Sequence, residues 1–387
     1  MDSTKRGLMM VGVSIAVLAA IAILMGVTGS SSGDIGAAAS GSTDKGGCTA
    51  LEHSLEEVQG AVQDAGKGDV ICLAGGTYGK LVLGDAGSGP PRVTVRAEKP
   101  GKTTLDGAEL GRSKVILARF VVTDSIDVEP GTVGVTVAHN RLSGGYFGVD
   151  AGPTDTVTVN DVAIVGNKFV GPFGEDAIRL NRYHDANGDG IGALVSGNEF
   201  FNVRENGNHS DCLQTVWVGD HLVYRDNYLH DNRCQGFFVK DQASPVRGIR
   251  IEDNLFLRND APCAPGADGC GAPSDLQVFG PYSGLTMRRN TIWGNGAIAA
   301  FQEADGTRAK IERNVVYKFF TSTDLSAARF RDNTRCQRQS SGGSWPLHVA
   351  GEIIACSPNF RAPGVDDYRV RGGRGVTWAP RNRHFGP

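Results

Sequence analysis

A short unit of strand, asparagine and strand recurs along most of the chain, and this repeat constrains the fold more than any other feature. In each copy a few mostly apolar residues lead into an asparagine, then one variable residue, then apolar residues again. The repeated asparagines are Asn140, Asn167, Asn198, Asn227, Asn254, Asn290 and Asn314. Units that recur at intervals of about 20–50 residues are typical of solenoids. Because no helical pattern lies between the copies, we expect parallel coils of strands, each covering the apolar interior of the next.

The seven asparagines have a structural role in this prediction. A bend between two strands of one coil often needs a left-handed backbone conformation, which asparagine tolerates. Side-chain amides stacked at the same bend of successive coils can also hydrogen-bond to one another along the axis. We therefore assign all seven to the scaffold and none to catalysis.

One helix is predicted ahead of the repeats, between residues 51 and 65. Its apolar residues fall on one helical stripe, and no later stretch shows this pattern at comparable length. The stripe consists of Leu51, Leu55, Val58 and Val62. Glycine is abundant, with 54 residues, which favours tight turns over long helices.

The N-terminus carries a targeting segment, residues 1–28. Lys5 and Arg6 precede an uncharged, mostly apolar run over residues 8–27. A helix of about 20 residues can cross a hydrocarbon core of ~30 Å, and basic residues before it keep the N-terminus cytoplasmic. Cleavage after Ala39 would make the segment a signal peptide instead. On either reading the rest of the chain lies outside the cytoplasm, and the membrane is a partner only through this segment.

Eight cysteines, an even number in an exported chain, predict disulfides. No CxxC pair is present, which argues against a zinc ribbon. Proximity in the sequence favours the pairs Cys48–Cys72, Cys263–Cys270 and Cys336–Cys356.

The helix, the run GDVICLAGGTY (68–78), the asparagine repeats and SPNFRAPGVDDYRV (357–370) together resemble the right-handed parallel β-helix proteins of the pectate-lyase-like superfamily. The resemblance implies an all-β fold, a single-stranded right-handed parallel β-helix (solenoid) with an N-terminal capping helix. The predicted parts are then an anchor or signal peptide (1–28), a flexible linker (29–47), the β-helix domain (48–375) and a C-terminal tail (376–387).

Members of this superfamily include polysaccharide lyases, glycoside hydrolases, uronan epimerases and scaffolds without activity, so the fold alone does not choose a function. The segment GEDAIRLNR (174–182) faintly resembles a motif of alginate and chondroitin lyases, but the matching downstream lysine and arginine segments are not recognisable. The paired aspartates and Gly-His-Gly of polygalacturonase-type hydrolases are also missing.

Three segments in the middle of the chain read as successive coils. They are 174–182, 208–217 and 233–242. Aligning Asp176, Asp211 and Gln235 as equivalent starts puts the apolar residues of each segment on the inner face. The outer face then carries Arg179, Gln214 and Phe238 in one column, extended by Gln277, and Asn181, Val216 and Lys240 in the next. Planar donors and an aromatic ring suit a sugar, so this face predicts binding of an acidic polysaccharide.

The resemblance implies a chemistry for this face. β-Elimination from a uronic acid needs a group that neutralises the carboxylate, a base for the C5 proton and an acid for the leaving oxygen. In lyases with this fold the base is often lysine or arginine, so Lys240 is the candidate base, with Arg179 and Gln214 as the carboxylate clamp. His209 and Asp211 are candidate accessory groups. The expected substrate-binding residues are Gln214, Phe238, Gln277 and Asn181.

Plain structural roles remain open for two of these residues. Lys240 also fits a solvated strand lysine beside Asp241, and His209 also fits a turn residue bonded to the next coil. With coils ~4.8 Å apart and a two-residue offset of ~6.6 Å, the backbones of Arg179 and Lys240 lie about 12 Å apart. The same register puts Cys212 and Cys234 at about 8 Å, beyond the usual disulfide span of ~4.4–6.8 Å. Either that pair is unbridged or the register slips by one residue.

The loop HDANGDGIG (184–192) predicts a calcium site. Asp185, Asn187 and Asp189 occupy the first, third and fifth positions of a calcium-binding loop, followed by a glycine. Ser196 stands where a bidentate glutamate is expected. A plain acidic turn is the alternative, and a structural ion is favoured over a catalytic one.

Two functions from different classes follow. The first is an extracytoplasmic polysaccharide lyase, or a related epimerase, acting on a uronate-containing glycan. The second is a β-helix that binds glycan, or spaces a surface, without catalysis. A net charge of -3 gives no basic excess, so nucleic acid is not an expected partner.

Overall fold

The computed structural model describes most of the chain from residue 47 to residue 380. The described residues are 47–84, 90–152, 157–204, 210–216, 219–232, 234–240, 246–258, 275–279, 282–294, 297–302, 309–346, 349–363, 367–370 and 373–380. They all belong to one compact unit, Gly33–Pro387, and the predicted membrane or signal segment and most of the linker lie outside them. Within the described ranges no helix has the length and apolar character needed to cross a membrane.

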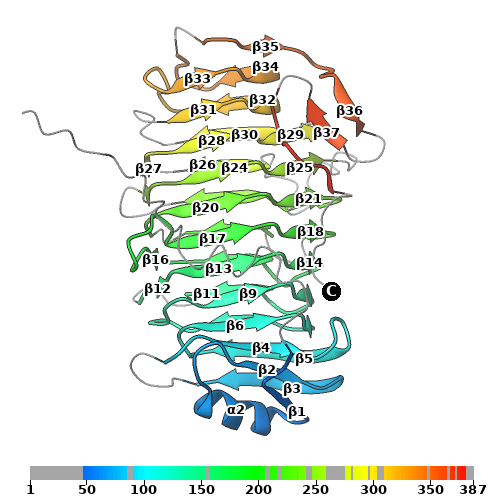
Figure 1. Ribbon diagram of the computed structural model, residues 1–387. Helices are drawn as coiled ribbons and strands as arrows, with labels where there is room; N and C mark the ends of the chain where they lie inside the picture. Colours follow the sequence, from blue (N-terminus) through cyan, green and yellow to red (C-terminus); the bar gives the residue numbers. More distant parts are fainter. Residues whose placement is uncertain are drawn as a thin grey trace, which may run out of the picture. The chain divides into compact units, whose positions relative to one another are not determined.

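Parallel strands stacked coil upon coil build the unit (Figure 1). One wall is a 12-stranded sheet. Its strands, in sheet order, are β1 (Ala50–Glu52), β2 (Val70–Leu73), β4 (Val93–Ala97), β6 (Val115–Ala118), β9 (Thr136–Ala138), β13 (Val162–Val165), β17 (Ala193–Ser196), β20 (Leu222–Arg225), β24 (Arg250–Glu252), β28 (Thr286–Arg288), β31 (Lys310–Glu312) and β33 (Arg329–Arg331). Every neighbouring pair in this wall is parallel, as stacked coils require.

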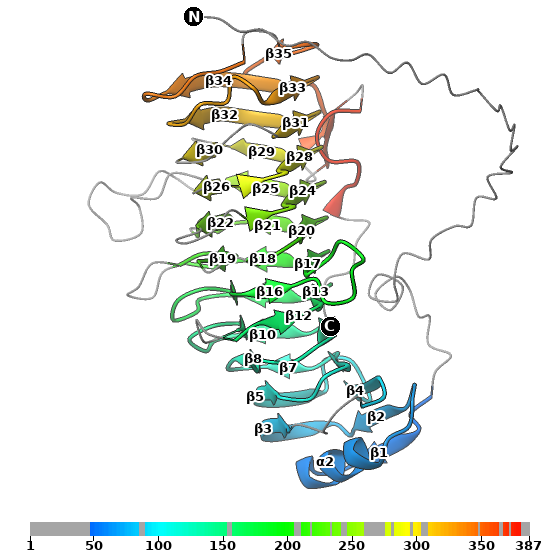
Figure 2. The same ribbon diagram turned by 90° about the vertical axis from the view of Figure 1, so that its left-hand side faces the viewer.

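The remaining walls form a 19-stranded sheet, seen from the side in Figure 2. Its strands are β3 (Gly76–Leu83), β5 (Thr103–Leu110), β7 (Val121–Val122), β8 (Ile126–Val128), β10 (Arg141–Ser143), β11 (Val149–Ala151), β14 (Lys168–Val170), β15 (Ile178–Leu180), β18 (Glu199–Phe201), β19 (Gln214–Thr215), β21 (Tyr228–His230), β22 (Phe237–Lys240), β25 (Leu255–Arg258), β26 (Leu276–Phe279), β29 (Thr291–Gly294), β30 (Ile298–Gln302), β32 (Val315–Thr321), β34 (Thr334–Ser340) and β35 (Ile353–Ile354). The parallel β-helix predicted from the repeats is confirmed.

Three small pairs of strands complete the unit. They are β12 (Val159–Asn160) with β16 (Tyr183–His184), β23 (Val246–Arg247) with β27 (Tyr282–Ser283), and β36 (Phe360–Ala362) with β37 (Asp367–Val370). The last pair is an antiparallel hairpin from the segment that carried part of the family resemblance.

The single helix of the described residues, α2 (Leu55–Asp64), caps the N-terminal end of the stack, as Figure 1 shows. It begins later than predicted. Ser54 is its N-cap and forms a capping box with Glu57, which fixes the start of the helix. Leu51, predicted on the apolar stripe, instead lies in β1 and is 45% exposed. Pairing of β1 with β2 takes that residue out of the helix.

Asparagines form a buried ladder along the stack. Each except the last donates its side-chain N–H to the side-chain oxygen of the asparagine in the next coil, at 2.9 to 3.2 Å. The ladder has the seven predicted members and an eighth, Asn333, and all eight are fully buried. The left-handed conformation expected at the asparagines lies one residue earlier instead, as at His139 (φ 54°) and Asp226 (φ 59°). Turning the chain one residue early lets each amide point inward to its partners.

Three disulfides join described residues, including the predicted Cys48–Cys72 and Cys336–Cys356. The predicted pair Cys263–Cys270 lies outside the described residues. Cys212 and Cys234 are also bridged, with Cα atoms 5.6 Å apart. The predicted register is nevertheless correct, because Asp211 pairs with Gln235. The distance was overestimated because Cys234 lies in a bend ahead of β22, where ideal strand spacing does not apply.

The segment predicted as a C-terminal tail packs on the stack up to Pro380. The indole N–H of Trp378 donates to the backbone oxygen of Asp253 at 2.8 Å, and the backbone N–H of Val376 donates to Thr291. Trp378 packs with Tyr228 of β21 and with Leu255 and Leu257 of β25 in a small apolar cluster. These residues therefore form part of the β-helix unit.

Candidate functional site

Four strands present the predicted outer column. Arg179 of β15 pairs in register with Gln214 of β19, which pairs with Phe238 of β22, which pairs with Gln277 of β26. The alternate residues on the inner side are buried, as the period of two requires. They are Ile178, Leu180, Leu213, Thr215, Phe237 and Val239. Sequence reasoning thus placed both faces of these coils correctly, and Figure 2 shows β19, β22 and β26 stacked on one side of the molecule.

Arg179 is already engaged within the protein. Its Nε donates to Oδ1 of Asp150 at 2.9 Å, and its Nη2 donates to Oδ2 of the same carboxylate. The guanidinium carbon also lies 4.0 Å from the centre of the Phe147 ring. Asp150 was not predicted, although it stands directly beside Arg179 in the preceding coil. The guanidinium of Arg179 is therefore held and oriented by groups of the protein itself.

The side chain of Gln214 is held by a hydrogen bond to the buried carboxylate of Asp211. Its side-chain N–H donates to Oδ2 of Asp211 at 2.9 Å, and Asp211 is fully buried. Asp211 in turn donates its backbone N–H to Oδ1 of Asp176 at 2.8 Å. With one amide hydrogen bound to Asp211, Gln214 keeps its carbonyl oxygen and its second N–H for the outer face. Asp211 is thus a positioning residue, because its carboxylate does not reach the surface.

Asp176 is held in its neutral form. It is fully buried, and burial, together with the nearby charge of Asp211, raises its pKa to about 9. A buried neutral carboxyl beneath the outer column was not foreseen from the sequence. The sequence indicates only that Asp176 stands at the start of its coil segment, at the position equivalent to Asp211 and Gln235.

Lys240 and Phe238 occupy the outer side of β22. Both side chains are partly exposed, whereas their neighbours Phe237 and Val239 are buried. The Lys240 ammonium lies 5.1 Å from the centre of the Phe279 ring, which comes from the next coil. Among the described residues Lys240 makes no ion pair, so its charge remains available on the outer face.

Two predicted residues differ from this arrangement. Asn181 is only 6% exposed, and its Oδ1 accepts a hydrogen bond from the backbone N–H of Val216 at 3.3 Å. Its amide oxygen is therefore used within the fold. His209 lies outside the described residues, and its predicted role stays a prediction.

The column continues into an acidic stretch toward the N-terminus. Asp150 pairs in register with Asp127, which pairs with Glu109. Lys80 lies 2.9 Å from Asp127 and 3.4 Å from Glu109, so one lysine serves two carboxylates. Glu129 lies nearby, and burial together with these carboxylates raises its pKa. The only sequence signal for this stretch was the alternation in the strands ahead of the first asparagine.

The oxygens of the predicted calcium loop accept backbone hydrogen bonds from the loop itself. Asp185 accepts from Gly188, Asp189 and Gly190, and its Oδ2 also contacts Nδ1 of His221 at 3.1 Å. The side-chain oxygens of Asn187 and Asp189 each accept a hydrogen bond from the backbone N–H of the residue two positions later. No group of three or more His, Cys, Asp or Glu side chains in the described ranges is arranged to hold a metal. As placed, these residues form a hydrogen-bonded turn.

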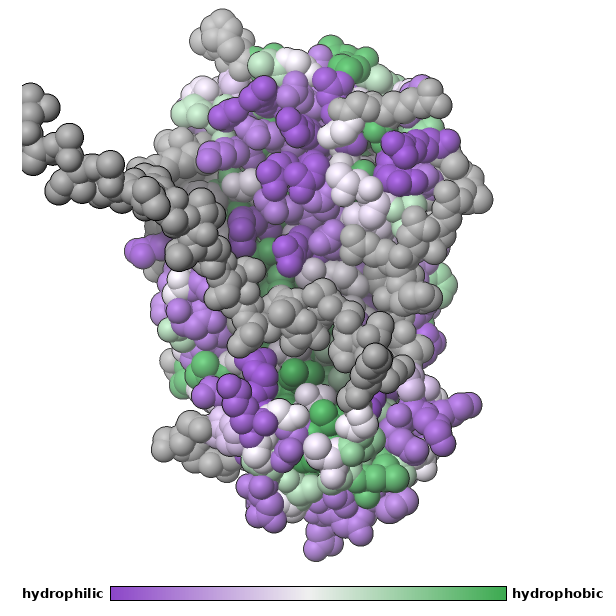
Figure 3. All heavy atoms as spheres, viewed as in Figure 1, coloured by the Kyte–Doolittle hydropathy of each residue, from purple (hydrophilic) through white to green (hydrophobic). Residues whose placement is uncertain are grey.

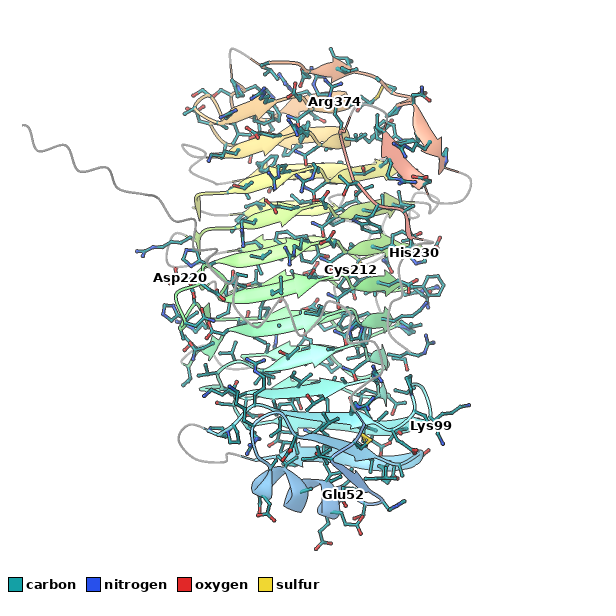
Figure 4. The ribbon with its side chains drawn as sticks, in the orientation of Figure 1. Glu52, Lys99, Cys212, Asp220, His230 and Arg374 are labelled. Atoms are coloured by element: carbon teal, nitrogen blue, oxygen red, sulfur yellow. A yellow bond between two sulfur atoms is a disulfide. The ribbon has the colours of Figure 1, made fainter. Side chains whose placement is uncertain are left out.

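The loop lies on the flank of the stack that carries Asp220. Asp220, whose carboxylate contacts His184 of the loop at 3.1 Å, projects from one flank of the stack in Figure 4. His230 lies on the opposite flank, and Cys212 lies between them. Calcium binding stays a prediction, and no chemical step is assigned to it.

Comparison with known proteins finds similar solved structures. The chain is similar to an alginate lyase in complex with G6, at 12% identity and a TM-score of 0.45, over 89% of this chain and 96% of that one. It is also similar to a PL6 family polysaccharide lyase from Pseudopedobacter saltans, at 11% identity and a TM-score of 0.38, over 86% and 100%. No protein-family model matches, and no curated protein matches.

A third similar structure is the A-module of a mannuronan C-5 epimerase from Azotobacter vinelandii, at 13% identity and a TM-score of 0.36, over 79% and 96%. As the repeats predicted, the chain resembles right-handed parallel β-helix proteins. At these identities and TM-scores the reaction has to be argued from the residues of this chain.

Proposed function

We propose that the protein is an extracytoplasmic carbohydrate-active enzyme that cleaves a uronate-containing glycan by β-elimination on the outer column. One observation carries the proposal. Arg179, Gln214, Phe238 and Gln277 stand in register on four consecutive coils, with Lys240 two residues beyond Phe238. Such a row offers charge, amide groups and an aromatic plane along one line, as a linear sugar chain requires.

Each part of the elimination has a residue in this proposal. Arg179 and the free N–H of Gln214 bind the sugar carboxylate, which makes the C5 proton more acidic. The Lys240 amine takes that proton, the bond from C4 to the leaving oxygen breaks, and a double bond forms between C4 and C5. The leaving oxygen then receives a proton from the Lys240 ammonium or from water.

The state of Lys240 is central to this mechanism. The amine must be neutral before it can accept a proton. A sugar bound against Phe238 and Phe279 would remove water from the amine, and desolvation favours the neutral form of lysine.

The proposed location rests on the disulfides. Three bridges among the described residues indicate an oxidising compartment, since disulfides are rare in the cytosol. Anchoring through residues 1–28 remains part of the proposal, together with its alternative, a cleaved signal peptide.

Absorbance tests the proposed reaction directly. Elimination creates an unsaturated sugar that absorbs at about 235 nm, whereas hydrolysis does not. The protein is incubated with a panel of polyuronates, and we expect absorbance to rise with at least one of them. Binding without any rise on the whole panel would refute the lyase and leave the second candidate.

That second candidate is a glycan-binding β-helix without catalysis. The bidentate pairing of Arg179 with Asp150 favours it, because this carboxylate already neutralises the guanidinium that a uronate would need. Retention of the protein in a gel that contains polyuronate measures binding alone. Comparison of retention with absorbance therefore separates the two candidates.

We also propose that loop 184–192 binds calcium as a structural ion, if its oxygens exchange their backbone hydrogen bonds for the metal. Titration calorimetry with calcium, on the full chain and on the variant Asp185→Asn, measures this. Absence of heat in both proteins, with unchanged unfolding temperature after chelation, would leave a plain turn.

A further inference from the structure

The outer face of the 12-stranded sheet carries two neighbouring columns with different charge patterns. One of them, called here the alternating column, pairs Glu252 with Arg288, Arg288 with Glu312, and Glu312 with Arg331 in register. Arg288 lies 3.6 Å from Glu252. Every cation of this column therefore has a carboxylate one coil away, which is the usual way to stabilise a charged sheet face.

The second column, called here the cation column, lacks this alternation. It consists of Arg250, Thr286, Lys310 and Arg329, again in register. Lys310 and Arg329 face each other across neighbouring strands, about 4.8 Å apart, and like charges so placed repel. Arg329 is relieved by Glu312 of the alternating column, at 2.8 Å. Neither Lys310 nor Arg250 has an ion pair with any residue that the structure describes.

The cation column borders a groove. A shallow cavity of about 430 Å³ is lined by small residues and by the two facing cations. The lining residues are Gly284, Thr286, Ala309, Lys310, Ala327 and Arg329. Figure 3 shows hydrophilic side chains gathered on this side over the coils of β24, β28 and β31. Small side chains on the floor and cations at the wall leave room for a ligand that brings negative charge.

We propose that this groove is a second, non-catalytic binding site for an acidic glycan chain that runs along the β-helix axis. The groove lies on the 12-stranded sheet and the candidate active site on the 19-stranded sheet, so the two do not overlap. A chain whose anionic groups follow the cation column supplies the negative charges that Arg250 and Lys310 do not receive from any described residue.

The choice of a glycan rests on the proposed function. Nucleic acid is the other linear polyanion, but the described lining residues include no aromatic ring on which a base could stack. The net charge of -3 also disfavours a nucleic-acid-binding protein. A flat, narrow polymer that carries one charge per unit fits the small-residue floor better than a base does.

Two double variants with the same change in net charge test the proposal. The first, Arg250→Ser with Lys310→Ser, removes the two cations of the cation column that have no ion pair among the described residues and leaves Arg329 with Glu312. The second, Arg288→Ser with Arg331→Ser, removes the two cations of the alternating column. Both are made in a protein that also carries Lys240→Ala and Phe238→Ala, which stops cleavage and weakens the first site. Retention in native gels that contain polyuronate measures affinity without any need for activity.

We expect the first variant to bind about 5- to 10-fold more weakly and the second to bind within about twofold of its parent. Parallel gels with a sulfated glycan, inorganic phosphate and an RNA homopolymer identify the ligand class. Equal losses in both variants, or no loss in either, would overturn the site. Stronger retention by RNA than by any glycan would overturn the ligand. A protein without cleavage activity but with this pattern of retention would refute the proposed reaction and keep the groove.

Discussion

The outer column has two halves built on the same backbone, and they differ in what they offer a ligand. Toward the N-terminus it presents Glu109, Asp127 and Asp150, whose charges are met by Lys80 and Arg179. Toward the C-terminus it presents Gln214, Phe238 and Gln277, with Lys240 alongside. The first half is paired within itself. In the second half the side chains of Phe238 and Lys240 are partly exposed, and Lys240 makes no ion pair with a described residue.

The difference shows that the solenoid sets positions and the side chains alone set function. In-register strands about 4.8 Å apart bring successive side chains into contact whatever their chemistry. The half with Glu109, Asp127 and Asp150 is called here the acidic half, and the half whose column residues are uncharged is called the neutral half. A polyanion is repelled by the three stacked carboxylates and is accepted by the neutral half. The boundary between the halves falls at Arg179, which forms an ion pair with Asp150 of the acidic half and lies beside Gln214 of the neutral half. We therefore expect the glycan to bind from Arg179 toward the C-terminus.

The largest expected effect is on the rate of elimination, when a lysine of the neutral half or one of the acidic half is replaced by alanine. Lys240→Ala should lower the rate of elimination by about 10²- to 10⁴-fold, the usual contribution of a general base. Lys80→Ala, the matched variant in the acidic half, should leave the rate within about twofold. Initial rates of absorbance increase on a polyuronate measure both. A similar loss in the two variants would remove the distinction between the halves.

Stability against pH probes the carboxyl beneath the neutral half. Asp176 has a pKa of about 9 in the folded protein and about 3.9 when unfolded. Between these values the unfolded chain releases a proton that the folded protein keeps, so stability falls as pH rises, by at most about 1.4 kcal/mol per pH unit. Asp176→Asn, which stays neutral, should reduce this fall.

Thermal unfolding from pH 5 to pH 9 measures that slope, since the unfolding temperature follows the free energy of unfolding. The control is Glu129→Gln, since burial also raises the pKa of Glu129, but in the acidic half. Glu129 is less buried than Asp176, so its variant should flatten the slope less. A steeper fall in Asp176→Asn than in the wild-type protein would contradict a neutral buried carboxyl.

The aromatic ring of the neutral half should contribute less than the base. Phe238→Ala removes a ring from the centre of the column, and we expect binding of a polyuronate to weaken by about tenfold. Phe320, in the same column two coils beyond Gln277, provides the matched variant Phe320→Ala. Gel retention measures both. If Phe320→Ala has the larger effect, the bound chain lies nearer the C-terminus than proposed.

The smallest effect is expected in the acidic half. Asp127→Asn removes one carboxylate and leaves Lys80 paired with Glu109. Exposed ion pairs contribute about 0–1 kcal/mol, so stability should change by less than about 1 kcal/mol. Binding of a polyuronate should rise by less than about twofold, which calorimetry can measure. A large rise would mean that the glycan already crosses the acidic half.

The fold, and the inner and outer faces of three coils, could be predicted from the sequence alone. It could do so because the asparagines mark each bend and strands alternate with a period of two. It missed Asn333, which stands only 19 residues beyond its partner Asn314, a shorter interval than in the other repeats. It also missed Asp150, because nothing in the sequence fixes that the chain returns to the same place on the wall 29 positions later, at Arg179.

The buried contacts below the column were equally hidden. The bond from Gln214 to Asp211 joins residues three apart, yet it depends on a bend that places Asp211 under the strand. The cation column requires the register of four separate coils, whose connecting loops differ in length. Alternation predicts which side a residue faces, and only register predicts its neighbours.

The asparagine ladder has a direction, and this makes the protein modular. Every rung from Asn140 to Asn314 donates to the asparagine of the next coil, and the backbone N–H of Phe120 donates to the first rung, Asn140. All the amide dipoles thus point the same way, and each hydrogen bond polarises the next. Any two rungs are interchangeable at their ends, so a whole coil can be removed or duplicated between equivalent asparagines without a new kind of contact. Lengthening or shortening by part of a coil would reverse the faces and break the chain of dipoles. The molecule can therefore gain or lose only whole coils. Because each coil contributes one asparagine, the number of stacked asparagines follows the length of any wall that binds a glycan.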